Sequence, residues 1–200
     1  MLTEYHPTGT LGDFIENDDR YLQLALPERM MLAIRYVEIL TFLHDSPSGT
    51  RAMCDSNRIK GTVKQYLVTD DGDIVVNDLD DLRLVQNGEM EGRICGHADF
   101  LYSRPDILEE KFLAPEQLDI TIGRHSDGKV NITSLPILDE KIDIYKVPAV
   151  TAYILGAIPG HNSIMDMLEP IHTACLRKDK RKRPSAAVVK NAYNKILNKL

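Results

Sequence analysis

The sequence is poor in cysteine and has no long apolar run. Its three cysteines are too few for a disulfide framework, and their spacing matches no zinc site. We expect buried free thiols, with a disulfide between Cys54 and Cys95 as the alternative in an oxidising compartment. No apolar stretch reaches the length of about 18 residues that a membrane-spanning helix needs. The first residues also lack the basic and then apolar pattern of a signal peptide.

Basic residues are fewer than acidic ones, so the formal net charge is -6 at pH 7. Proteins that bind nucleic acids need a basic face to displace counterions from phosphates, so this class is not expected. Residues 177–183 (RKDKRKR) are a local exception. Asp179 interrupts this run and a helix is expected after it, which favours a solvated loop over a nucleic-acid or lipid patch.

Glycine-rich phosphate loops are absent too. None of the 12 glycines forms a G-x-G-x-x-G motif. Residues 123–129 (GRHSDGK) match a Walker loop except that Val130 replaces the final Ser or Thr, so the hydroxyl that would bind magnesium is missing. The following VNIT alternates like a strand. We therefore predict a hairpin turn in this segment.

A β-hairpin with polar residues at its open end is the clearest local feature. Apolar residues 66–68 and 74–76 flank a turn of Asp, Asp, Gly and Asp. Asp55 and Gln65 precede the first strand and Asp78 follows the second, so three oxygen-bearing side chains can converge there. Phosphoryl transfer needs a carboxylate to orient the attacking hydroxyl and further oxygens to hold magnesium. Solvated turn residues are the alternative interpretation.

The spacing of these residues resembles a protein kinase. A kinase catalytic loop has an Asp, a metal-binding Asn and then an Asp-Phe-Gly motif. Asp55, Gln65 and Asp78 stand in that order, and Gln65 precedes Asp78 by the 13 positions of the kinase pattern. Five extra residues separate Asp55 from Gln65. Ala114-Pro115-Glu116, Asp143 and Arg183-Pro184 then follow in kinase order.

The amino-acid sequences of four segments resemble those of the protein O-mannose kinases. These segments are residues 43–47, 50–57, 65–67 and 77–80. The resemblance covers all 200 residues and implies a mainly α, α+β fold: a protein-kinase-like C-lobe with a small hairpin at the catalytic site. It implies a hinge segment at 1–10, the catalytic loop and metal-binding hairpin at 53–80, and an activation segment at 81–116. We expect the N-lobe to lie outside this chain.

The resemblance also implies a function. These enzymes transfer the γ-phosphate of ATP to the 6-hydroxyl of an O-linked mannose in a glycan on dystroglycan, within protein O-mannosylation. Asp55 would be the catalytic residue, and Gln65 and Asp78 would hold Mg²⁺ or Mn²⁺. The backbone of the hinge would meet the adenine at Glu4, Tyr5 and His6.

Three further positions take structural roles by the same resemblance. Glu116 and Arg183 would form a buried ion pair between the activation segment and the C-terminal helices. Asp143 would brace the backbone of the catalytic loop from the start of a core helix.

The catalytic loop departs from the common kinase form. Cys54 replaces the Arg that reads a phosphorylated activation segment, which predicts an enzyme not switched on by such phosphorylation. Asn57 replaces a Lys, whose charge Arg58, Lys60 or Lys64 could restore.

Two other functions stay open. The chain could be a non-catalytic pseudokinase or truncated module that binds a glycan or partner, or a kinase with another substrate. The resemblance places the enzyme at the endoplasmic reticulum membrane, on the lumenal side, through an N-terminal anchor that we expect outside these 200 residues. ATP and the O-mannosyl glycan are the expected partners.

Apolar periodicity predicts the remaining elements. A short helix begins at Leu11, and further helices are expected over 27–44, 139–155, 164–175 and 185–200. Pro27 suits a first helical turn. Pro148, inside the third of these helices, predicts a kink or an interruption.

Overall fold

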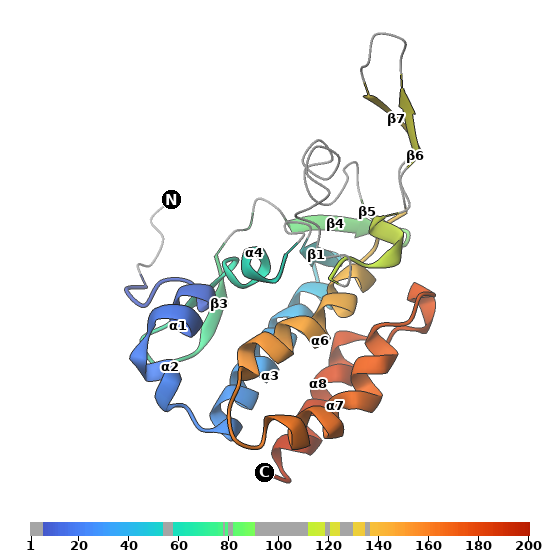
Figure 1. The fold of residues 1–200 in the computed structure, drawn as a ribbon. Coiled ribbons are helices and arrows are strands. Elements are labelled where there is room, and N and C mark those ends of the chain that lie inside the picture. The colour runs from blue at the N-terminus through green and yellow to red at the C-terminus, as the bar shows by residue number, and fades with distance from the viewer. Residues whose placement is uncertain are drawn as a thin grey trace.

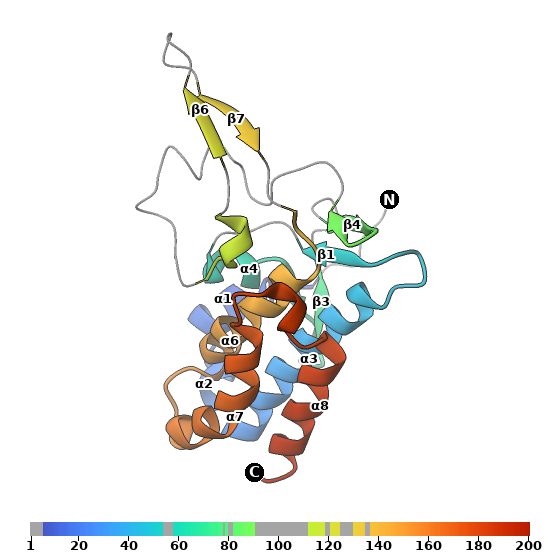
Figure 2. The same cartoon turned by 90° about the vertical axis from the view of Figure 1, so that its right-hand side faces the viewer.

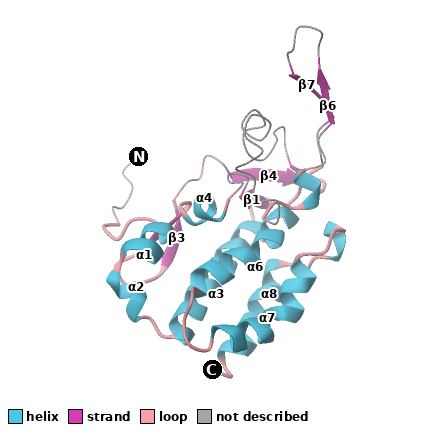
Figure 3. Cartoon of the chain, viewed as in Figure 1, coloured by secondary structure: helices cyan, strands magenta, loops and turns pink. Residues whose placement is uncertain are grey.

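The structure is a computed structural model. It describes residues 6–53, 58–77, 79, 82–90, 112–118, 121–124, 130–134 and 137–200. Helices dominate the described residues, and the strands form small antiparallel sheets (Figure 3). This confirms the expected mainly helical, α+β class.

The described α-helices were predicted to within a few residues, except for two short ones, at Asp19–Gln23 and Ile59–Val63, which were not predicted. They are α1 (Leu11–Asn17), α2 (Asp19–Gln23), α3 (Leu26–His44), α4 (Ile59–Val63), α6 (Lys141–Leu155), α7 (His161–Cys175) and α8 (Ala186–Leu197). Two 3₁₀ turns, η2 (Pro115–Gln117) and η3 (Lys180–Lys182), accompany them. Pro27 lies in the first turn of α3 as predicted, because a missing N–H costs nothing there.

The strands are β1 (Arg51–Met53), β2 (Tyr66–Val68), β3 (Ile74–Val76), β4 (Leu82–Gln86), β5 (Glu89–Met90), β6 (Thr121–Arg124) and β7 (Val130–Ser134). The predicted hairpin is present as β2 and β3, with Tyr66 opposite Val76. Strands β6 and β7 pair antiparallel, so Val130 begins a strand and not the helix of a Walker loop. A sheet in the order β1-β4-β5 was not predicted.

The core lies between the long helices. Helix α3 packs against α6 and α8, and α7 packs on both α6 and α8 (Figures 1 and 2). Fully buried apolar side chains such as Leu40, Ile144 and Val150 fill this space, and each contributes about 1.5 to 3 kcal/mol relative to an exposed position. Cys175 is a buried free thiol in this core, as expected. Cys54 and Cys95 lie outside the described residues.

Helix α6 runs through Pro148 without interruption, so that part of the prediction was wrong. Proline removes one helical hydrogen bond. Burial outweighs this loss, because Ile144, Val147 and Ile154 of the same helix are fully buried in the core. In the described part of the chain, every helix is too short or too polar to span a bilayer.

The end of α6 is capped by two side chains from the N-terminal part of the chain. The Tyr21 hydroxyl donates to the carbonyl of Ile154 at 2.9 Å, and the Arg29 guanidinium donates to that of Leu155 at 3.0 Å. These bonds satisfy carbonyls that a helix end leaves without intrahelical partners. Gly156 follows with φ +60°, and a Cβ there would lie 2.7 Å from the Tyr21 hydroxyl.

We therefore expect Gly156→Ala to be markedly destabilising. The positive φ and the collision with the capping side chains should together cost about 3 kcal/mol, whereas Gly72→Ala should cost about 1 kcal/mol. Gly72 is a matched control, because it has φ +82° with no atom near its missing Cβ. Urea unfolding of both variants measures the difference. Equal losses would show that the contacts around Gly156 are not constraining.

Candidate active site

The first group of site residues surrounds the buried carboxylate of Asp143, in the first turn of α6. Asp143 is 1% exposed, and its Oδ2 accepts the backbone N–H of Met53 at 2.9 Å. The same oxygen lies 3.1 Å from Nε2 of His44, the last residue of α3. One carboxylate thus joins α3, β1 and α6. The bond to Met53, two residues before Asp55, is the type of contact expected of Asp143.

Strand pairing relates the two segments that carry the predicted carboxylates. Met53 is opposite Leu82 in the antiparallel pair of β1 and β4. The chain after β1 and the chain before β4 therefore connect to the same end of this ribbon. Asp55 belongs to the first of these connections and Asp78 to the second, but both residues lie outside the described ones.

Gln65 lies at the open end of the hairpin formed by β2 and β3. Its carbonyl accepts the N–H of Asn77 at 2.8 Å, which extends the ladder by one pair beyond Tyr66 and Val76. Gln65 is therefore opposite the residue that precedes Asp78. This register agrees with the spacing argument, and the shared metal site remains a prediction. Among the described residues, no group of three or more His, Cys, Asp and Glu side chains could hold a metal ion.

The expected ion pair of Glu116 and Arg183 is present. The two terminal guanidinium nitrogens donate to the carboxylate, at 2.5 Å for Nη1 to Oε1 and 2.7 Å for Nη2 to Oε2. The Arg183 side chain is fully buried and that of Glu116 is 14% exposed. Arg183 also donates to the carbonyls of Arg177 and Lys141. It joins η2 to the start of α6 and to the loop before α8, so it is not part of a solvated loop.

Only some of the other expected site residues lie within the described part of the chain. Glu4 and Tyr5 lie outside the described residues, while the carbonyl of His6 accepts the N–H of Gly9 at 3.1 Å. Most of the expected activation segment also lies outside them. Of the cations proposed to replace the missing catalytic-loop Lys, Lys60 forms an ion pair with Glu16 on α1, at 2.7 Å.

Two buried polar residues, Lys146 and Gln117, were not identified from the sequence. Lys146 is 2% exposed on α6, and its ammonium lies 5.7 Å from the centre of the Phe112 ring. Gln117 is 3% exposed, and its Oε1 accepts the N–H of Ala114 at 3.0 Å. Gln117 therefore contacts the start of the Ala114-Pro115-Glu116 segment, and Lys146 lies over Phe112, two residues before it. A polar residue within an apolar helical stripe, as Lys146 is, could have signalled a buried polar contact.

Comparison with known proteins identifies the relatives of this chain. No protein-family model matches it. It is 39% identical over 208 residues to "Protein O-mannose kinase" of Homo sapiens and 40% identical over 205 residues to that of Gallus gallus. The protein of the same name from Xenopus laevis is 37% identical over 200 residues.

These alignments cover 98 to 100% of this chain and 54 to 55% of the relatives, so the chain spans slightly more than half of their length. Its relatives are thus enzymes named as kinases. The chain is a homologue of the protein O-mannose kinases over its whole length.

The buried ion pair gives a test by mutation. We expect Arg183→Ala to lower the free energy of unfolding by about 3 to 5 kcal/mol, because it leaves the Glu116 carboxylate without its partner. Arg181→Ala is the matched control, since Arg181 is 85% exposed and pairs only with Asp179 among the described acidic residues. It should change stability by less than about 1 kcal/mol. An Arg183→Ala variant that unfolds thermally with the parent would contradict the role assigned to this pair.

Proposed function

We propose that this chain is the C-terminal lobe of a protein-kinase-like enzyme that phosphorylates a carbohydrate. The complete enzyme would transfer the γ-phosphate of ATP to the 6-hydroxyl of an O-linked mannose in a glycan on dystroglycan. Homology to protein O-mannose kinases over the whole chain carries this proposal. The bond from Met53 to Asp143 and the register of Gln65 with Asn77 support it, because both agree with the contacts that the resemblance to kinases implies.

Asp55 is the residue that we assign to catalysis. A primary alcohol is a weak nucleophile, so a carboxylate that aligns it and accepts its proton lowers the barrier, typically by 10² to 10⁴-fold. The bond from Met53 to Asp143 fixes the backbone two residues before Asp55. We propose that this anchor sets the position of the catalytic loop.

Gln65 and Asp78 are the proposed metal-binding residues. A carbonyl oxygen and a carboxylate are suitable donors for a hard cation such as Mg²⁺ or Mn²⁺, and the hairpin register brings Gln65 opposite the neighbour of Asp78. When bound, the cation neutralises charge on the phosphates of ATP. The backbone at Glu4, Tyr5 and His6 is the proposed contact for the adenine.

An exposed apolar face beside β3 supports the proposal that the complete protein has an N-lobe. Phe42 is 70% exposed, Leu79 61% and Val75 37%, and they line a depression of about 530 Å³ beside β3. Exposed apolar patches of this kind usually mark an interaction surface. We propose that the N-lobe of the complete enzyme covers this face. Anchorage at the endoplasmic reticulum membrane, facing the lumen, is part of the same proposal.

The test is phosphate transfer by the complete protein. We expect Asp55→Asn to retain its fold and nucleotide binding but to lose at least about 10²-fold in transfer from ATP to an O-mannosyl glycan. Asp70→Asn, which makes the same change at an exposed position in the hairpin turn, should keep the parental rate. The 200 residues alone should be inactive, because an N-lobe is needed to hold the nucleotide.

Transfer by Asp55→Asn at the parental rate would exclude Asp55 as the catalytic residue. A glycan-binding module without catalysis would then be the better account.

A further inference from the structure

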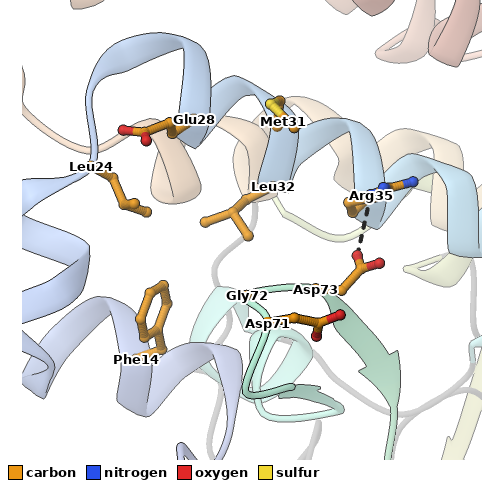
Figure 4. A pocket seen from close by; sticks show the side chains of 9 residues that line it. All are labelled: Phe14, Leu24, Glu28, Met31, Leu32, Arg35, Asp71, Gly72 and Asp73. Carbon is orange, nitrogen blue, oxygen red and sulfur yellow. Dashed lines mark ion pairs between the residues drawn. The ribbon is translucent and has the colours of Figure 1, made fainter.

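A second pocket lies at the far end of the hairpin from Gln65. It is a depression of about 330 Å³ between α1, α3 and the turn that joins β2 to β3 (Figure 4). Figure 4 shows the side chains of Phe14, Leu24 and Leu32 directed into the same space. None of the residues assigned to catalysis, metal binding or nucleotide binding lines it. Its size is at the lower end of the range for ligand pockets.

The floor of this pocket is apolar. Phe14 and Leu32 are each 5% exposed and are held by the core, so they form a fixed surface. Met31 on the edge is 48% exposed, and a methionine side chain adapts its shape to what packs on it. An apolar side chain entering from solvent would be buried here, which is worth about 25 cal/mol per Å² removed from water.

The edge of the pocket is acidic. Glu28 lies on the α3 side, and Asp71 and Asp73 lie on the hairpin side, against a single guanidinium from Arg35. Arg35 is already bound by two carboxylates, at 2.7 Å to Glu38 and 3.2 Å to Asp73. A hydrogen bond from the Thr69 hydroxyl holds the pKa of Asp71 below its usual value, so this carboxylate is charged at neutral pH. The residues lining the pocket therefore carry net negative charge.

These two properties select the occupant. The acidic edge would repel an anionic ligand, and a purely polar ligand would leave the apolar floor in contact with water. We infer that the pocket binds a peptide segment of a partner protein, which places an apolar side chain on the floor and an adjacent lysine or arginine against the acidic edge. Hot-spot contacts of this kind combine a buried apolar anchor with charges that orient the segment. The inference does not depend on the proposed catalytic role of Asp55.

A random 12-residue peptide display library, selected on the complete protein, tests this inference. We expect enriched sequences in which a large apolar residue lies next to lysine or arginine. A fluorescent peptide from that set should bind at least tenfold more weakly to the charge-reversed double variant Glu28→Lys with Asp71→Lys. Met31→Lys should weaken binding to a similar degree, because it places a charge over the apolar floor.

The matched control is the double variant Asp166→Lys with Glu169→Lys. It makes the same change of charge on the exposed face of α7, away from the pocket, and should bind the peptide with parental affinity. Phosphate transfer to a free O-mannosyl glycan should be unchanged in the Glu28 and Asp71 double variant. Peptide binding and catalysis are thus read separately.

Several outcomes would overturn the inference. These are the absence of enriched sequences, enrichment without basic residues, or equal binding by the two charge-reversed double variants. Self-association that the Glu28 and Asp71 reversal abolishes, seen by sedimentation velocity in place of peptide binding, would assign the pocket to a second copy of the chain.

Discussion

The arrangement around the site depends on the contacts that the buried carboxylate of Asp143 makes. Desolvating a carboxylate is costly unless donors replace the lost water, and here the Met53 N–H and the His44 ring lie close to one oxygen. The three groups come from β1, α3 and α6, so the contact forms only when these elements are assembled. The catalytic loop proposed for this protein therefore begins from a position that the helical core determines.

The pair of Glu116 and Arg183 has the same character and lies near the same, N-terminal end of α6. Arg183 contacts a carboxylate on η2 and the carbonyls of Arg177 and Lys141, while its guanidinium carbon lies 4.9 Å from the centre of the Tyr145 ring. A planar guanidinium can make all these contacts together, and an ammonium cannot. The two contacts connect Met53, at the start of the expected catalytic loop, and Glu116, at the end of the expected activation segment, to the start of one helix.

Local patterns in the sequence predicted the long helices, the short helix at Leu11 and the β2–β3 hairpin, because periodicity and turn residues act over a few positions. The short helices α2 and α4 were missed. The sheet of β1, β4 and β5 was missed, since its strands are short and Met53 pairs with Leu82 across 29 positions. The predicted interruption at Pro148 was wrong, because the burial that stabilises α6 is a tertiary effect that local sequence does not show. The pair of Glu116 and Arg183 could be predicted only from family resemblance, and no local pattern indicates Gln117.

The most direct measurement of the central claim is an experimental structure of the complete protein with Mg²⁺ and a non-hydrolysable ATP analogue. If the open end of the β2–β3 hairpin is a kinase metal site, side-chain oxygens of Gln65 and Asp78 should lie within about 6 Å of each other. Each should approach the cation at about 2.1 Å, the distance that magnesium requires. Side-chain oxygens much farther apart, or a cation held by other residues, would contradict the account.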